Sequence, residues 1–305
     1  MSPKRGFASA KRPLSTELGV VTAGLVVLFV WSRLVGLAAS RAAVGSLPSV
    51  EWVPVGPAFA GGLFALGVVA LAGAFAAVRG VDAGLSLPSR ADLRFVGLAV
   101  ATPVVLVGVT AFVGLYTGVP YSSLTMTYYP DPASPATLAL VGVGTAVAVP
   151  CLAVTCQVLV QGSLARAFDG GRAVLATTLV AAFATLSTAG GLTAVPERGK
   201  LAGAAAFVLA LAVLRYAADA VGGRARSLAA ATASLFAAAL LLAGVAGVES
   251  IAAGLFALAH LAVLGVAAYA YERTGSLLVP ALAYLSVSLS NAAVVLVVEA
   301  GGTPF

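Results

Sequence analysis

Long apolar runs with few charges recur along the whole of this 305-residue chain, and they constrain its fold more than any other feature. A helix needs about 20 consecutive apolar residues to cross a bilayer, and within lipid every backbone polar group must be paired inside the protein. We therefore predict an all-α, polytopic bundle of about eight or nine transmembrane spans. The candidate spans are about 18–38, 56–78, 95–117, 136–160, 173–194, 200–218, 227–247, 251–271 and 276–298.

The composition supports the same class. Hydrophobic residues make up 61% of the chain and charged residues 9%, against roughly 45–50% and ~25% in soluble domains. The apolar runs leave no room for a separate soluble domain, so we predict one membrane-embedded domain over residues 1–305, with a basic leader at 1–17. The first apolar run exceeds the 7–15 residue core of a signal peptide, which favours a retained anchor.

The basic residues predict an orientation. If the N-terminus is cytoplasmic, 13 of the 17 Lys and Arg residues fall in segments on the inside and four on the outside, which is the bias of the positive-inside rule. The excess of Arg over Lys and the abundance of Ala, Val and Gly indicate a prokaryote, so we expect a multi-pass protein of the plasma membrane with a cytoplasmic N-terminus. Contact with anionic lipid explains the net charge of +6 without nucleic acid as a partner.

One segment has the outline of a catalytic motif. Residues 155–164 read T-C-Q-V-L-V-Q-G-S-L. This segment resembles the E-E-x-x-x-R motif, usually E-E-L-L-F-R-G-L-L, of the CPBP family of intramembrane endopeptidases, which includes the CAAX prenyl proteases and bacteriocin-processing proteins. Cys156 and Gln157 stand at the two glutamates, Gln161 stands at the arginine, and Gly162 and Leu164 match.

The C-terminal region extends the resemblance. Residues 264–284 are similar to the family's G-x-x-x-x-x-x-E-R-T-G-S-L-x-x-P-I-L-x-H, which leads into its third motif, H-x-x-x-N. Alignment through the T-G-S-L string places Tyr284 at the histidine and Ser288 at the asparagine. A register shifted by three places Asn291 at the asparagine and Val287 at the histidine. The resemblance covers residues 137–298, with about two additional spans near 198–247.

The second family motif, F-x-x-x-H, has two candidates. Phe183–Ser187 follows the first motif by about the family's 30 residues and has Ser187 at the histidine. The string Phe256–His260 contains the only histidine of the chain, but only 24 residues separate His260 from Tyr284, where the family has an intervening helix. We expect His260 to be a neutral side chain that cross-links helices; the alternative is a pocket or a relocated site.

The residues at the motif positions predict the loss of catalysis. The resemblance implies a glutamate base that activates water, with histidines and an asparagine around it. A glutamine amide cannot accept that proton, and neither Ser187 nor Tyr284 has the pKa of an imidazole, which is near 6.5. A catalytic zinc needs about three protein ligands, so a single histidine predicts no metal, and no motif indicates a cofactor.

We therefore predict a catalytically inactive CPBP-like protein that binds a membrane protein or a hydrophobic or prenylated peptide. Its polar cavity would hold Gln157, Gln161, Ser187, Tyr284 and Ser288 and open toward the cytoplasmic half. An active endopeptidase with a rearranged site around His260 and an unrelated transporter-like membrane protein are the alternatives. We expect Cys151 and Cys156 to be buried, without a disulfide, because five residues on a helix place them about 140° apart.

Overall fold

The computed structural model describes residues 13–41, 55–127, 129, 131, 134–195, 198–220, 223–246 and 248–299. All regular elements in these ranges are helices, apart from one isolated bridge between Leu186 and Leu192. Six helices are long and apolar enough to cross a membrane. The chain is therefore a helical membrane protein, as the apolar runs predict.

The helices follow the predicted runs closely. The bounds are α1 Leu14–Arg41, α2 Val55–Arg79, α3 Leu93–Thr117, α5 Pro135–Ala153, α7 Gly170–Thr185, α8 Arg198–Ala220, α9 Gly223–Ala246, α10 Ile251–Thr274 and α11 Leu278–Ala293. Two π-helices, η3 Val154–Gln161 and η4 Val294–Glu299, continue α5 and α11. The short elements η2 Arg90–Asp92, α4 Tyr121–Thr125 and α6 Gly162–Leu164 lie in the connections.

Helix α7 is shorter than the predicted span 173–194. It ends at Thr185 after 16 residues, which is about 24 Å at 1.5 Å per residue, less than the ~30 Å of a hydrocarbon core. The chain then makes a tight turn in which Leu186 pairs with Leu192. Gly190 has a φ of +90° there, and a Cβ at this position would lie 3.0 Å from Ala257. The apolar run thus continues past the helix because the turn is also built from apolar and small residues.

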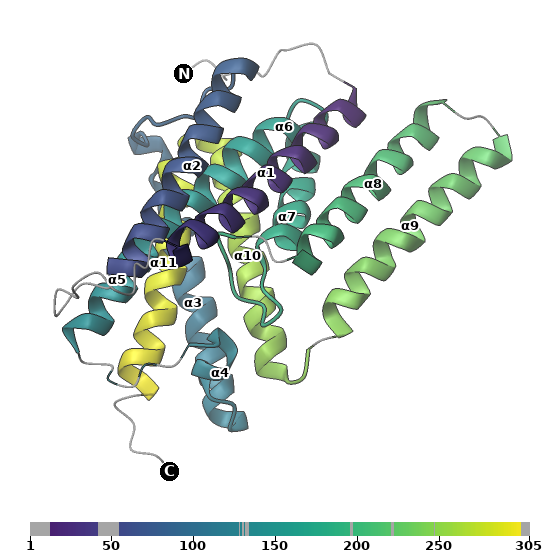
Figure 1. The fold of residues 1–305 in the computed structure, drawn as a ribbon. Helices are drawn as coiled ribbons and strands as arrows, with labels where there is room; N and C mark the ends of the chain where they lie inside the picture. Colours follow the sequence, from purple (N-terminus) through teal and green to yellow (C-terminus); the bar gives the residue numbers. More distant parts are fainter. Residues whose placement is uncertain are drawn as a thin grey trace.

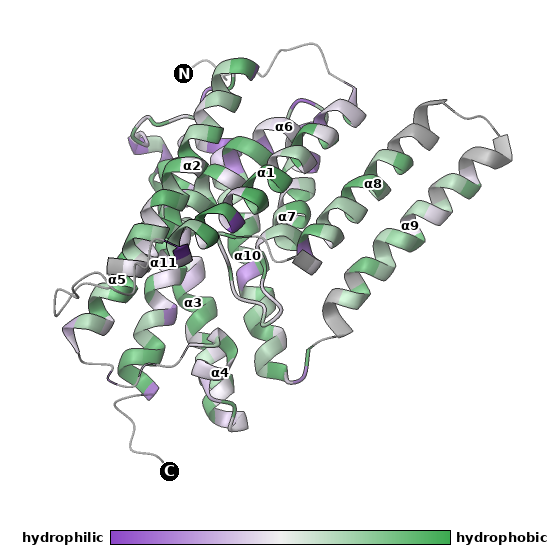
Figure 2. Cartoon of the chain, viewed as in Figure 1, coloured by the Kyte–Doolittle hydropathy of each residue, from purple (hydrophilic) through white to green (hydrophobic). Residues whose placement is uncertain are grey.

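The helices form a bundle around α10, with a helical hairpin at one side. Helix α10 packs against α3, α7 and α11, and α8 packs against α1 and α7. Figure 1 shows α8 and α9 as a hairpin beside the bundle, with α9 on the outside. In Figure 2 the hydrophobic residues follow the long helices. The core lies mainly in the bundle, and α8 joins it through the buried side chains of Ala204, Phe207 and Val208.

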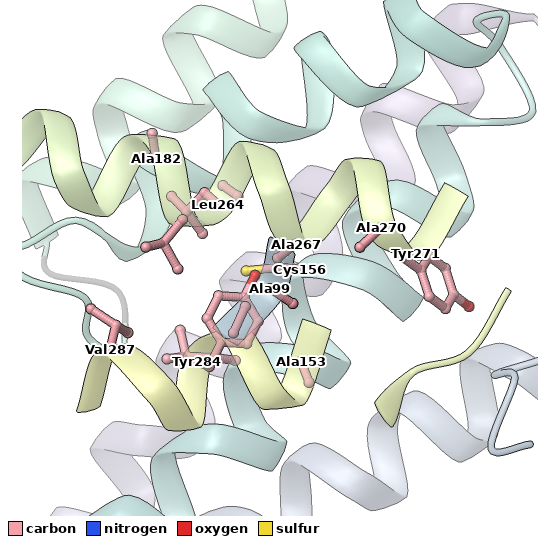
Figure 3. Close-up of a cluster of buried hydrophobic side chains, with 14 of the residues drawn as sticks. Ala99, Ala153, Cys156, Ala182, Leu264, Ala267, Ala270, Tyr271, Tyr284 and Val287 are labelled. Carbon is pink, nitrogen blue, oxygen red and sulfur yellow. The ribbon is translucent and has the colours of Figure 1, made fainter. Parts of the chain in front are cut away.

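Small side chains allow the central helices to approach closely. Ala99, Ala267, Ala268 and Ala283 are each fully buried, and Figure 3 shows several alanines in one cluster with Cys156 and Tyr284. Without a hydrophobic driving force between helices in lipid, such packing of small residues supplies contact energy.

The bundle has two distinct ends. We call one the basic end, formed by the start of α1 and by the connections 80–92, 165–169 and 275–277. Two contacts join these connections: the Leu277 amide donates to the Gly84 carbonyl at 2.8 Å, and the Ser276 hydroxyl donates to the Ser86 carbonyl at 2.6 Å. The basic side chains of this end are Arg79, Arg90, Arg94, Arg166, Arg172 and Arg273. We call the opposite end, with α4 and the turn 186–195, the distal end (Figure 1).

A buried ion pair connects the first two helices at the basic end. Arg79 of α2 pairs with Glu17 of α1, whose side chain is fully buried. Arg166 donates to the carbonyl of Arg79. Since a buried pair is costly to leave half-formed, these contacts fix α1 against α2 and α6.

Candidate functional site

The segment that resembles the first CPBP motif lies in the π-helix η3, and its side chains are buried. The Gln157 Nε2 donates to the Tyr284 hydroxyl of α11 at 3.1 Å. Figure 3 shows the sulfur of Cys156 beside the Tyr284 hydroxyl. Tyr284 is 1% exposed, so its ring fills the space next to the residues at the two glutamate positions.

Gln161 makes a separate contact. Its Nε2 donates to the Ala268 carbonyl of α10 at 2.9 Å, and its Oε1 has no hydrogen-bond partner among the described residues. Both glutamines are buried and face the interior, which confirms that neither side chain is directed at lipid.

A cavity of about 280 Å³ lies between α5, α10 and α11. Its polar lining from the three helices comprises Thr145, His260, Tyr284, Ser288 and Asn291. Its apolar lining includes Val149, Leu152, Phe256, Val287 and Val295. The cavity is therefore mostly apolar, with a polar wall formed by the two C-terminal helices.

The position of the cavity differs from the prediction in two ways. Thr127, Tyr129 and Leu192 belong to its lining, so it lies toward the distal end and not toward the basic end. Gln157 and Gln161 are not lining residues. Gln157 bonds Tyr284, which lines the cavity in its place, and Gln161 bonds the Ala268 carbonyl. The error arose because periodicity shows which side chains face inward but not which of them border an open space.

Ser187 also lies outside the cavity. It follows α7 in the turn, where its hydroxyl accepts from the Gly191 amide at 3.1 Å and its own amide donates to the Gly191 carbonyl at 2.7 Å. Its role is to close the turn. His260, which the sequence spacing disfavoured as the second motif, is the residue that lines the cavity with Tyr284, Ser288 and Asn291.

A chain of hydrogen bonds determines the tautomer of His260. Its Nδ1 lies 2.8 Å from the Phe256 carbonyl, and its Nε2 lies 3.2 Å from the Asn291 Nδ2. A carbonyl only accepts, so Nδ1 carries the proton and Nε2 accepts from the asparagine amide. The Asn291 Oδ1 in turn accepts from the Tyr121 hydroxyl at 2.6 Å. His260 is therefore a neutral imidazole with both nitrogens bonded, as the cross-linking hypothesis predicts.

Sequence reasoning missed Tyr121, the third residue of the hydrogen-bond chain that holds His260. It lies in α4, packs edge-on against Phe256 with ring centroids 5.6 Å apart, and is 2% exposed. Burial and the nearby Glu299 carboxylate raise its pKa well above the usual value near 10, so it remains a hydroxyl donor. The only sequence signal was its place in a loop rich in tyrosine, which indicated a membrane interface rather than a site.

The remaining candidate positions, Ser288, Cys151 and Cys156, carry hydroxyl or thiol groups. The hydroxyls of Ser288 and Thr145 are 2.9 Å apart across α11 and α5. Cys151 and Cys156 are buried free thiols. No group of three or more His, Cys, Asp or Glu residues that could hold a metal occurs within the described ranges.

Comparison of the chain with family models, with curated proteins and with solved structures finds no match.

Proposed function

We propose that this protein is a catalytically inactive, CPBP-like membrane protein whose cavity binds a hydrophobic or prenylated membrane peptide. The observation that carries the proposal is that the polar groups lining the cavity, above all both nitrogens of His260, are hydrogen-bonded to other protein groups. Ligand pockets are typically about 300–1,000 Å³ with apolar walls and a few polar groups. At about 280 Å³ the cavity has the size for one apolar chain end or a few side chains, with Ser288 and Asn291 to bind a polar group.

The same bonding state argues against hydrolysis. Peptide hydrolysis in this class needs a base within hydrogen-bond reach of a water molecule. Gln157 does not line the cavity, and the glutamine amide is not a base. His260 is the one imidazole, and both its nitrogens are bonded to protein groups. No basic lone pair is therefore directed at the cavity.

The position of His260 supports the family resemblance and revises one part of it. The family resemblance implies that the second motif, F-x-x-x-H, and the third motif, H-x-x-x-N, border the same site. Phe256 and His260 line the cavity together with Tyr284 and Ser288, whereas Ser187 does not. We therefore assign the second motif to Phe256–His260, so that the family histidine is retained there and lost at Tyr284.

That assignment gives an active endopeptidase some support as a second candidate. His260 and Asn291 are 3.2 Å apart in one cavity, and displacement of the Asn291 amide by a substrate would free Nε2 as a base. This candidate requires substrate binding to break the hydrogen-bond chain before any proton is transferred.

An activity assay separates the two candidates. Purified protein in lipid vesicles is incubated with a prenylated CAAX peptide and with a generic transmembrane substrate, alongside the variants Gln157→Ala and His260→Ala. We expect no turnover by any of the three. Turnover by the wild type that His260→Ala abolishes would establish the second candidate in place of the first.

A binding assay tests the cavity itself. Ala148 lines the cavity from α5, whereas Ala146 of the same helix is exposed. We expect Ala148→Phe to abolish binding of a fluorescent prenylated peptide, because the added ring occupies the cavity, and Ala146→Phe to leave binding unchanged. Equal binding by both variants would exclude the cavity as the site.

We also propose that the basic end is cytoplasmic and that the membrane is the plasma membrane of a prokaryote. Helices α8 and α9, with the shorter α7, would bring the six long apolar helices to about eight or nine spans. The concentration of arginines at the basic end supports this orientation. Single cysteines at Ser123 in α4 and at Ser89 before η2 test it, because both residues are exposed. An impermeant thiol reagent should label Ser123→Cys in intact cells and label Ser89→Cys only after lysis. The reverse pattern would invert the assignment.

A further inference from the structure

A second, more open groove lies at the basic end, far from the cavity in the fold. It has a volume of about 420 Å³ and is lined by Arg94, Phe95 and Leu98 of α3 and by Tyr269 and Arg273 of α10. One arginine comes from the first turn of α3 and the other from the last turn of α10. The antiparallel packing of these two helices thus places two guanidinium groups along one depression.

Aromatic rings hold both guanidinium groups in place. The Arg94 Cζ lies 4.7 Å from the centroid of the Phe95 ring, and the Arg273 Cζ lies 5.1 Å from that of Tyr269. The two rings pack edge to face, with centroids 5.8 Å apart. Contact with a ring face leaves the N–H donors at the edge of each guanidinium available. The groove therefore has an aromatic floor between two ordered donors.

The two arginines have no acidic partner within the described part of the chain. The buried carboxylate of Glu17 pairs with Arg79 and not with either of these two arginines. The closest acidic residue in sequence to Arg94 is Asp92, and its carboxylate accepts from the Ser89 amide and hydroxyl at 2.9 and 2.6 Å. No acidic residue of the described ranges lines the groove, so its two charged lining side chains are both arginines. Arg is the side chain best suited to bidentate contact with a phosphate.

The surface next to the groove is apolar. Leu98 lines the groove and is 39% exposed, and about two to four turns further along α3 the side chains of Val105, Val109 and Phe112 are 47% to 70% exposed. Helix α3 is long and apolar enough to cross a membrane. If it crosses from this end, the groove at its first turn is at headgroup depth and the apolar strip runs toward the bilayer centre. A ligand that fits both surfaces has an anionic head and an apolar tail.

We propose that Arg94 and Arg273 bind the phosphate of an anionic phospholipid from the leaflet at the basic end, with an acyl chain along α3. Basic pockets between transmembrane helices bind anionic headgroups by this combination of charge and depth. The site is independent of the cavity, since the two share no lining residue.

The test is native mass spectrometry of the detergent-solubilised full-length protein, titrated with phosphatidylglycerol and separately with phosphatidylcholine. We expect the wild type to retain one phosphatidylglycerol in preference to phosphatidylcholine. The double variant Arg94→Ala/Arg273→Ala should bind it about 30-fold more weakly, at roughly 1 kcal/mol per arginine and 1.4 kcal/mol per factor of ten. Lysine at both positions should restore part of the affinity, because the charge returns without the planar fork.

Arg172→Ala is the matched control. Arg172 is an exposed arginine at the same end that does not line the groove. We expect this variant to bind phosphatidylglycerol like the wild type. An equal loss in Arg172→Ala and in the double variant would overturn the proposal, because it would show general attraction to the basic end. Displacement of the lipid by millimolar inorganic phosphate would likewise overturn it, because the site would then recognise a free anion.

Discussion

Replacing Asn291 with leucine tests the hydrogen-bond chain that holds His260. The amide of Asn291 donates to the His260 Nε2 at 3.2 Å and accepts from the Tyr121 hydroxyl at 2.6 Å. Leucine has a similar volume but neither donor nor acceptor, so the substitution removes both hydrogen bonds while it preserves packing. It also leaves the His260 Nε2 without its hydrogen-bond donor.

The structure limits the expected loss of stability. A hydrogen bond between membrane helices contributes about 0.6 kcal/mol on average and about 1.7 kcal/mol at most. His260 is 1% exposed and Tyr121 is 2% exposed, so the groups that lose their partner are buried and the cost is near the upper value. Two such bonds give an expected loss of about 2 to 3 kcal/mol in the free energy of unfolding.

Two measurements check this prediction. Unfolding of the purified protein in mixed detergent micelles gives the change in free energy. Because His260 is the only histidine, ¹⁵N-histidine labelling gives a single imidazole spectrum, in which the wild type should show the proton on Nδ1 and a bare, hydrogen-bonded Nε2. In Asn291→Leu the Nε2 resonance should shift as its donor is lost, and Nδ1 should remain protonated through the Phe256 carbonyl.

Ser286→Ala is a suitable control. The Ser286 hydroxyl of α11 donates to the Val100 carbonyl at 2.9 Å in an exposed contact, so its loss should cost less than about 0.5 kcal/mol. A proton on Nε2 in the wild type, or a loss in Asn291→Leu no larger than that of Ser286→Ala, would refute the hydrogen-bond chain.

Two further substitutions test contacts at the basic end, the ion pair between α1 and α2 and the packing of Gly84 against Gly275. Replacing Glu17 with glutamine should destabilise the protein by about 3 to 5 kcal/mol because it leaves Arg79 buried without its partner, and the double variant Glu17→Gln/Arg79→Met should recover part of this loss in the same unfolding titration. Gly84→Ala should prevent stable folding, since Gly84 has a φ of +64° and a Cβ there would lie 1.9 Å from the Gly275 carbonyl oxygen. The control is Gly73→Ala in α2, which should be neutral or slightly stabilising because nothing lies within 4 Å of the added Cβ. Equal melting temperatures for the two alanine variants would contradict the observed packing.

The sequence was sufficient for the helices because the bilayer allows few alternatives. A run of about 20 apolar residues without charges has one stable conformation in lipid, and the spans predicted near α2, α3 and α10 match their observed bounds within a few residues. Span 173–194 was wrong at its end, because hydropathy does not distinguish an apolar helix from the apolar turn in which Leu186 pairs with Leu192.

The site was less accessible from the sequence. The inward direction of Gln157 and Gln161 followed from the cost of an unpaired amide in lipid, and both are buried. Their partners, Tyr284 and the Ala268 carbonyl, lie more than 100 residues away in the chain. Such contacts depend on how α5 and η3 pack against α10 and α11, which the spacing of motifs along one chain does not determine.

The choice between Ser187 and His260 shows the same limit. Spacing from the first motif favoured Ser187, but spacing along a chain that contains an additional helical hairpin is a poor measure of distance in space. Helices α8 and α9 are inserted between the turn that holds Ser187 and the helix that holds His260. Sequence proximity to Tyr284 was the better guide to which residue borders the cavity, since α10 and α11 are consecutive helices that pack together.

Tyr121 connects α4 to His260 through the side chain of Asn291. Glu299 at the end of η4 accepts from the backbone amides of Tyr121 and Ser122, which attaches α4 to the helix that carries Asn291. The Tyr121 hydroxyl reaches the Asn291 amide from the same short helix. Any displacement of α4 that widens the distal end therefore also withdraws a partner from Asn291, whose other hydrogen bond occupies the His260 Nε2. Asn291 thus joins α4, α10 and α11 through its two side-chain hydrogen bonds, so the single substitution Asn291→Leu breaks the hydrogen-bonded connection between α4 and α10 and leaves the His260 Nε2 without its donor.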